Sequence, residues 1–260
     1  MSELFSYLSA HFWGFLFVFF RLSALFLAFP FFSTSFVPRR VKVVLLLAFS
    51  FFFAQVAQLQ VSPPSSLFEL AAIALKELLI GFLFALISSI FYGVIYYAGE
   101  LISYLMGLTV ANLFDPTFGT VSVLGRFFLF TFYAVFFATG GAEVFVSALY
   151  KSFEVLPVGT LPLSPSLFKL LVEDSSLIFS LGFQMAFPFL FALFLTNLAL
   201  ALVNRLIPQI NVFIVGLPLQ LFVGLLLLAL GFSVVVYFMV SLSNRFGEEL
   251  FRLLEVLKVG

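Results

Sequence analysis

The sequence predicts an all-α integral membrane-type protein with about six hydrophobic helical segments, some kinked or broken and some possibly not spanning the bilayer. First, 63% of the 260 residues are hydrophobic and 9% are charged, whereas a soluble domain carries about 25% charged residues. Second, apolar stretches of about 20 residues, the length that crosses a hydrocarbon core of roughly 30 Å, recur along the chain. Third, Pro, Gly and polar amides interrupt several of these stretches, which indicates kinks and breaks.

Each predicted segment is a long apolar run between turn residues or charges. The second is marginal in length, and the last two are long enough to tilt, kink or extend beyond the hydrocarbon. The six segments are 12–32, 41–57, 78–98, 127–150, 177–203 and 212–241.

The first segment and the loop that follows it carry four basic residues. Arg21 lies inside the segment, where an Arg costs about 2.5 to 3.5 kcal/mol, so its side chain should face protein or a polar cavity. Snorkelling of Arg21 to an interface is the alternative. Arg39, Arg40 and Lys42 form the tightest basic cluster of the chain and indicate a cytoplasmic loop.

The third and fourth segments carry charges near their ends. Ser65 or Ser66 should cap a helix whose first turns contain Glu69 and Lys76, charges that usually mark a solvated helix end. In the fourth segment two adjacent glycines, 140 and 141, favour a bend or a close helix approach. Glu143 follows them and is interpreted as a buried paired group or the end of the span, with a proton relay as the less favoured alternative.

The second half of the chain is predicted from its polar interruptions. Residues 151–174 are rich in Pro and Ser and predict an exposed polar loop with a short helix. Polar amides in the fifth segment and in 204–213 should form hydrogen bonds between helices. Pro208 and Pro218 indicate two helical halves that meet at a polar hinge. Residues 244–260 have the spacing of an amphipathic helix on a membrane surface or a partner.

The stretch 99–126 is the centre of the predicted organisation. Small residues, an Asn, two acids and a Pro are threaded through apolar ones, and such a segment should not face lipid. We expect residues 107–119 to form a pore-facing or subunit-facing loop, with a helix that stops at Asp115 and Pro116 because Pro disfavours helix at the preceding residue.

The composition excludes several kinds of site. The chain has no Cys, one His and a formal net charge of +0, which excludes thiolate and multi-histidine metal sites and gives no reason to expect a nucleic-acid partner. No catalytic motif is present, and the paired acids 173–174 and 248–249 are interpreted as surface charges. We therefore expect no cofactor and no enzymatic activity.

The basic residues do not orient the chain in a membrane. If all six segments cross, one side collects five Lys and Arg and the other collects six. The positive-inside rule therefore does not choose a topology. Either the Lys and Arg residues of the tail and the long loop do not count under this rule, or not every segment crosses the bilayer.

Three separated blocks of residues together resemble the FliR family, the T subunit of type III secretion export gates. Arg21 belongs to the first block, and residues 204–219 form the third and most specific block. The blocks cover nearly the whole chain and comprise Arg21, 30–33 and 37–43; Gly99, Glu100, Gly107, Leu108, Asp115, Pro116, Ser152, Phe153 and 156–159; and 204–219 with Gly224. The chain departs from the family at three places. The family usually has Gly at the position of Ser103, Gln near Leu105, and a Gly-His pair where this chain has Gly141-Ala142.

The resemblance implies a non-enzymatic subunit of the flagellar export gate, in the bacterial inner membrane at the flagellar basal body. Its implied partners are FliP, FliQ, a FlhB-type subunit and unfolded protein substrates, and its helices would form FliP-like and FliQ-like hairpins. The implied pore plug comprises Gly107, Asn112, Asp115, Pro116 and Gly119. The residues implied in subunit packing are Arg21, Glu100, Arg205, Pro208, Gln209 and Asn211.

This resemblance also implies a division of the single export-gate domain. Residues 1–98 would form the first helical hairpins and 99–126 the plug region. The middle helices would occupy 127–203, followed by a C-terminal hairpin at 204–243 and the amphipathic tail. The alternative function is a small-solute secondary transporter, since such proteins also use broken helices and midspan carboxylates, although the two halves of the chain show no inverted repeat.

Overall fold

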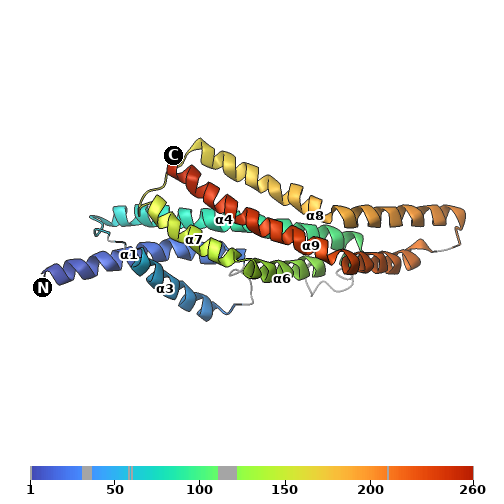
Figure 1. The fold of residues 1–260 in the computed structure, drawn as a ribbon, viewed down its shortest axis with the longest axis horizontal. Coiled ribbons are helices and arrows are strands. Elements are labelled where there is room, and N and C mark those ends of the chain that lie inside the picture. Colours follow the sequence, from blue (N-terminus) through green and yellow to red (C-terminus); the bar gives the residue numbers. More distant parts are fainter. Residues whose placement is uncertain are drawn as a thin grey trace. The chain divides into compact units, whose positions relative to one another are not determined.

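The structure is a computed structural model that describes residues 2–30, 37–57, 59, 61–110, 122–209 and 211–259. In this part of the chain every regular element is a helix (Figure 1). The elements are α1 Ser2–Ala28, α3 Arg39–Val56, α4 Leu67–Leu105, η1 Leu108–Val110, α6 Val123–Ala138, α7 Gly141–Val155, α8 Pro165–Leu206 and α9 Val212–Val259. The predicted all-α fold with about six hydrophobic segments is confirmed, the fourth segment being divided into α6 and α7.

Two boundaries differ from the prediction for the second half of the chain. The polar loop expected over 151–174 is limited to 156–164, because α7 continues to Val155 and α8 begins at Pro165. Pro at the first helical position is favourable, since its missing N–H would have no partner there. The tail expected as a separate helix over 244–260 is the continuation of α9.

The described helices form two compact units. Unit 1 comprises Met1–Ile90, Ala142–Asp174 and Arg245–Gly260, and unit 2 comprises Phe91–Gly141 and Ser175–Asn244. The three long helices α4, α8 and α9 therefore each contribute one part to each unit.

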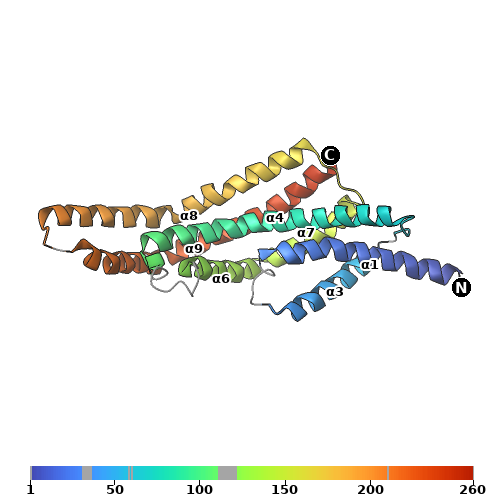
Figure 2. The same cartoon turned by 180° about the vertical axis from the view of Figure 1, so that it is seen from behind.

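Unit 1 is held together by close packing of α1 on α3 and on the first half of α4 (Figure 2). A Cβ placed on Gly81 of α4 would lie 1.8 Å from the carbonyl oxygen of Arg21. The two helices therefore approach backbone to backbone at this point, which a larger residue would prevent. Phe17, Phe53 and Phe84 are almost fully buried in the same core.

Unit 2 uses a similar close approach between α4 and α6. A Cβ on Gly99 would lie 2.5 Å from the Cα of Gly125. The side chains of Phe128, Met185 and Leu193 are buried around the packed helices. Ser122 precedes α6 and accepts a hydrogen bond from the Gly125 N–H at 2.9 Å, as an N-cap residue does.

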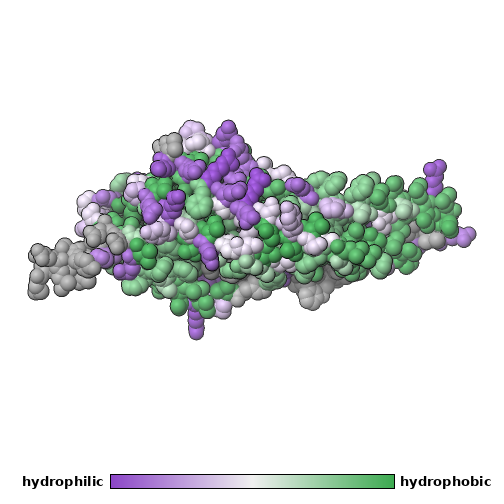
Figure 3. Space-filling view, viewed as in Figure 1, coloured by the Kyte–Doolittle hydropathy of each residue, from purple (hydrophilic) through white to green (hydrophobic). Residues whose placement is uncertain are grey.

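Four described helices are long and apolar enough to cross a membrane, in α1, α4, α8 and α9, or five if α6 and α7 form one broken span. Little of the apolar window is buried in α8 (22%) and α9 (17%), so these helices present apolar surface outward. Figure 3 shows hydrophilic residues gathered over the start of α8 and the end of α9, both in unit 1, while the unit 2 parts of these helices are hydrophobic. The chain is therefore a membrane-type protein.

Candidate functional site

The candidate site is the connection between α4 and α6, whose two ends the structure describes. Helix α4 ends at Leu105, and the Gly107 N–H donates to the carbonyl oxygen of Tyr104 at 3.1 Å. Gly107 has φ +75°, a left-handed conformation that side chains disfavour. The end of α4 thus differs from the stop expected at Asp115, because a glycine turn ends the helix earlier.

A buried hydrogen bond ties the two ends of this connection together. The hydroxyl groups of Ser103 on α4 and Ser122 before α6 lie 2.8 Å apart, and both side chains are buried. Since Ser122 also caps α6, a single residue fixes the start of that helix and its link to α4. The end of α4 and the start of α6 are therefore held close together within unit 2.

Helix α9 packs against the beginning of the connection. A Cβ on Gly107 would lie 2.7 Å from Cδ2 of Leu217, and a Cβ on Gly224 would lie 2.4 Å from Cγ of Met106. Met106 is itself buried. These contacts hold the turn after α4 on the surface of α9.

Of the five predicted plug residues, the structure places Gly107, at the start of the connection. The other four, Asn112, Asp115, Pro116 and Gly119, lie outside the described residues. The plug therefore stays a prediction, while the anchoring of its two ends is observed.

The polar centre of unit 1 is a buried ion pair that links α1 to α4. Nε of Arg21 lies 2.7 Å from Oε2 of Glu77, and neither side chain has any exposed surface. The guanidinium carbon lies 4.2 Å from the ring centroid of Phe153 on α7, a cation–π contact. Arg21 thus faces protein as predicted, and snorkelling is excluded by its burial.

The same pair also fixes the turn between α7 and α8. The Arg21 guanidinium donates to Oγ of Ser152 at 3.0 Å and to the Leu156 carbonyl oxygen at 3.1 Å. The Gly159 N–H donates to Oε1 of Glu77 at 2.9 Å. A buried charge needs a partner and satisfied hydrogen bonds, and these contacts supply both. Sequence reasoning missed Glu77, because it lies one residue before the predicted third segment.

Helix α4 begins with the predicted serine cap. Ser66 Oγ accepts a hydrogen bond from the Glu69 N–H at 3.2 Å, and the Glu69 carboxylate accepts one from the Ser65 N–H at 2.6 Å. Lys76 is exposed, as predicted for a solvated helix end, and its ammonium donates to the Gly159 carbonyl oxygen at 2.9 Å.

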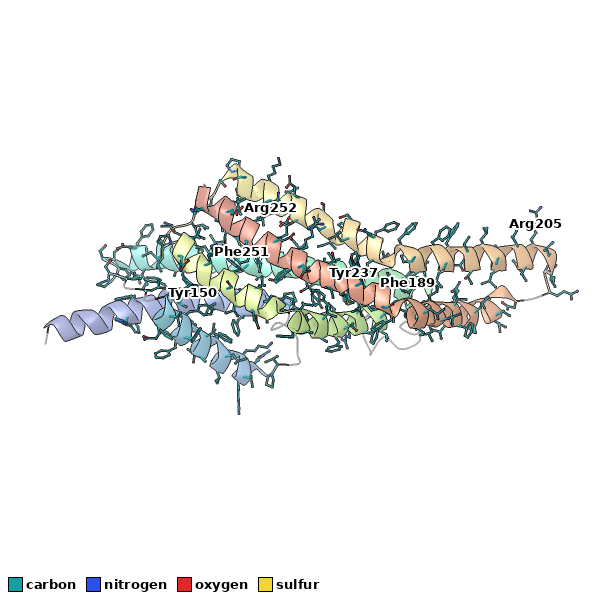
Figure 4. All side chains as sticks on the ribbon, in the orientation of Figure 1. Tyr150, Phe189, Arg205, Tyr237, Phe251 and Arg252 are labelled. Carbon is teal, nitrogen blue, oxygen red and sulfur yellow. The ribbon has the colours of Figure 1, made fainter. Side chains whose placement is uncertain are left out.

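A second charged cluster in unit 1 joins the start of α8 to the end of α9. Arg252, labelled in Figure 4, lies 2.9 Å from Glu173, 3.3 Å from Glu249 and 3.9 Å from Asp174. Asp174 and Glu249 are 1% and 7% exposed. These two acids were expected to be surface charges, which was wrong because the two helices pack against each other there.

The residues expected in subunit packing occupy different environments. Arg21 is enclosed in unit 1, and Glu100 is half-buried on α4. Figure 4 shows Arg205 pointing away from the end of α8, and Pro208, Gln209 and Asn211 are exposed beside it. This exposed turn between α8 and α9 agrees with the interruption predicted at Pro208, whereas Pro218, predicted to interrupt the chain with it, lies inside the continuous helix α9.

Two other predicted groups are accounted for locally. Asn197 on α8 accepts a hydrogen bond from the side-chain amide of Gln220 on α9, which confirms a polar amide contact between these helices. Glu143 is exposed in the first turn of α7, consistent with the end of a span. Within the described residues, no three His, Cys, Asp or Glu side chains are arranged to hold a metal ion.

Comparison with known proteins identifies the family. The model of the family described as bacterial export proteins, family 1, matches residues 12–246. The flagellar biosynthetic protein FliR of Aquifex aeolicus (strain VF5) is 34% identical over 242 residues, which cover 91% of this chain and 90% of that protein.

Two further relatives show the same extent of similarity. FliR of Escherichia coli (strain K12) is 34% identical, with 86% of this chain and 84% of that protein covered. FliR of Bacillus subtilis (strain 168) is also 34% identical, with 85% and 87% covered. Since the family match and these relatives extend over most of the chain, it belongs to family 1 of the bacterial export proteins, with the FliR flagellar biosynthetic proteins.

Proposed function

We propose that this chain is a subunit of the flagellar type III protein export gate, in the inner membrane at the flagellar basal body. In this role it assembles with FliP and FliQ, and with a FlhB-type subunit, around a conduit for unfolded flagellar proteins. It carries structural and gating functions, with no catalysis of its own. The family relationship supports the flagellar context.

The observation that carries the gating part of the proposal is the anchored connection after α4. The Ser103–Ser122 hydrogen bond holds both ends of this connection at one place on unit 2. A segment that is fixed at its ends and carries glycines near them, here Gly107 and Gly119, can change conformation between its ends without disturbing the supporting helices. We infer that residues 107–121 form a plug that closes the conduit and moves aside during export.

The observation that supports assembly is the apolar surface of unit 2. Phe187, Phe194 and Leu226 are about half exposed, at 52%, 59% and 47%. Beside this apolar surface, the exposed residues Arg205, Pro208, Gln209 and Asn211 lie at the end of the hairpin. We infer that FliP and FliQ helices cover part of this surface, with Arg205, Pro208, Gln209 and Asn211 at the contacts.

Two experiments test these two parts separately. Co-production with FliP and FliQ, followed by purification through one tag on this chain, should recover all three proteins; recovery of a well-behaved solitary monomer contradicts assembly.

Deletion of residues 112–118 should make cells permeable to small solutes, because the conduit loses its closure while Ser103 and Ser122 remain. Deletion of three residues from the 59–65 connection, which is far in sequence from the plug, serves as the control. If both deletions leave permeability and flagellar protein export unchanged, residues 107–121 are not a plug.

A further inference from the structure

Helix α3 has one face in the core of unit 1 and another exposed. Ser50, Phe53 and Ala54 are buried, and the rings of Phe49 and Phe26 contact each other with centroids 6.1 Å apart. This contact fixes which side of α3 faces α1 and which side faces outward.

The outward side of α3 is an apolar stripe. Exposed side chains recur every three or four residues, the spacing of one helix face. They are Val43 (54%), Val44 (64%), Leu47 (44%), Phe51 (60%) and Phe52 (54%). This is a contiguous apolar surface that water solvates poorly.

The apolar part of α3 is too short to cross a bilayer. Basic residues occupy the start of the helix as far as Lys42, which leaves 43–56 as its apolar part. At 1.5 Å per residue this part is about 21 Å long, against a hydrocarbon core of about 30 Å. Apolar helical stretches of roughly 10 to 14 residues are typically core helices or re-entrant or interfacial segments. The exposed stripe shows that the described residues of this chain do not bury the outward face of α3.

Charge and apolar surface are segregated along the helix. Arg39 and Arg40 are exposed at its start, and the first turn of α3 contains no acidic residue. An Arg guanidinium binds phosphate oxygens through paired hydrogen bonds. Beyond Arg39 and Arg40, the outward face of α3 presents the apolar side chains of the stripe.

A hollow of about 540 Å³ lies at the other end of α3, between that helix and α7. Its lining is mainly apolar and includes Phe52, Val56, Val146 and Tyr150, with the exposed Glu143 as its charged member. This volume lies in the range of about 300 to 1,000 Å³ that ligand sites occupy. From Arg39 to Phe52 the helix rises about 20 Å, comparable with the roughly 15 Å of hydrocarbon in one leaflet.

We infer that the outward face of α3 docks on anionic phospholipid. The lipid phosphate binds Arg39 and Arg40, and its acyl chain follows the apolar stripe toward the hollow between α3 and α7. The separation of cationic and apolar surface along one helix matches a phospholipid, which has its charge at one end and hydrocarbon along its length. A protein partner on the same face is the competing occupant.

The test uses site-specific fluorescence, for which the chain is well suited because it has no native Cys. Val43→Cys and, separately, Val44→Cys are labelled with an environment-sensitive fluorophore in the full chain, isolated from membranes with whatever it assembles with. The labelled protein is reconstituted in vesicles of phosphatidylcholine and phosphatidylglycerol at 7:3. Two vesicle preparations are compared: in one the phosphatidylglycerol carries a nitroxide quencher on its acyl chain, and in the other the phosphatidylcholine carries it. The quencher-bearing lipid makes up the same fraction of total lipid in both.

We expect the fluorophore on α3 to be quenched about fivefold more strongly by labelled phosphatidylglycerol than by labelled phosphatidylcholine. This preference corresponds to about 1 kcal/mol. The R39Q/R40Q variant should lose this preference, and 0.5 M salt should reduce it. The K169Q/K258Q variant, which removes two positive charges from exposed positions on α8 and α9, should retain it.

Equal quenching by both lipids in the unmodified background overturns the proposal. Absence of quenching by either lipid at both labelled positions also overturns it and indicates that a protein covers α3.

Discussion

At the scale of single residues, the Arg21–Glu77 pair determines how unit 1 is assembled. Its contacts reach α1, α4, α7 and the turn that precedes α8. Removing one member of a buried pair leaves an uncompensated charge and typically costs about 3 to 5 kcal/mol, whereas replacing both with apolar residues of similar volume is often much less costly.

We therefore predict that Arg21→Met and Glu77→Leu each lower the free energy of unfolding by about 3 kcal/mol or more. The R21M/E77L double variant should recover part of this loss. Denaturant titration in detergent measures the three values, and Lys169→Gln is the control because the Lys169–Glu173 pair is largely exposed. Additive losses in the double variant would show that the two residues do not act as a pair.

The need for a partner of Arg21 could be predicted from the sequence, but the identity of the partner could not. The cost of an isolated Arg in an apolar segment required a buried contact. Glu77 lies 56 residues away along the chain, and no local pattern relates the two positions. Similarly, Ser103 and Ser122 are unremarkable as residues and become an anchor only where two helices bring them together.

At the scale of elements, glycines decide where helices end and how closely they pack. The break between α6 and α7 was predicted from two adjacent glycines, and the structure places Gly140 there with φ +77°. The end of α4 at Leu105 agrees with the start of the loop predicted over 107–119, but not with the helix stop placed at Asp115-Pro116, which was the stronger local signal. A lone Gly inside an apolar run gives no indication of its backbone conformation.

Two glycine substitutions should have opposite effects on stability. Gly140→Ala should destabilise the protein by about 1 to 2 kcal/mol, since the left-handed conformation crowds a Cβ. Gly231→Ala should stabilise it by about 0.5 to 1 kcal/mol, because Gly231 lies within α9 and no atom lies within 4 Å of the added Cβ. Thermal unfolding of both variants, measured in the same detergent, checks these signs. A stabilising Gly140→Ala would contradict the conformation assigned to the break.

At the scale of the whole molecule, polarity separates the unit 1 parts of α8 and α9 from the unit 2 parts of the same two helices. The polar residues at the start of α8 and the end of α9 belong to unit 1, and the exposed apolar parts of the same helices belong to unit 2. The sequence predicted the apolar lengths well. It placed a long loop at 151–174 because that stretch is rich in Pro and Ser, although Pro165 and Ser166 begin α8.

We predict that single cysteines will report this separation in membranes. Lys169→Cys and Glu255→Cys should react at least about tenfold faster with a charged maleimide than Leu198→Cys and Leu226→Cys, since the reactive thiolate is disfavoured in apolar surroundings. Denaturation in detergent should equalise the four rates and serves as the control. Equally fast labelling of Leu226→Cys in intact membranes would show that this part of α9 faces water.

The interleaved composition of the two units bears on how the protein is made. Unit 1 begins with the first residue and includes Arg245–Gly260, and unit 2 takes both of its pieces from between these ends. Neither unit can be obtained as one continuous fragment, and unit 1 has all its parts only after residues 245–260 have left the ribosome. Until these residues emerge, the nascent chain therefore holds an unfinished core of unit 1, although all of unit 2 has already been synthesised.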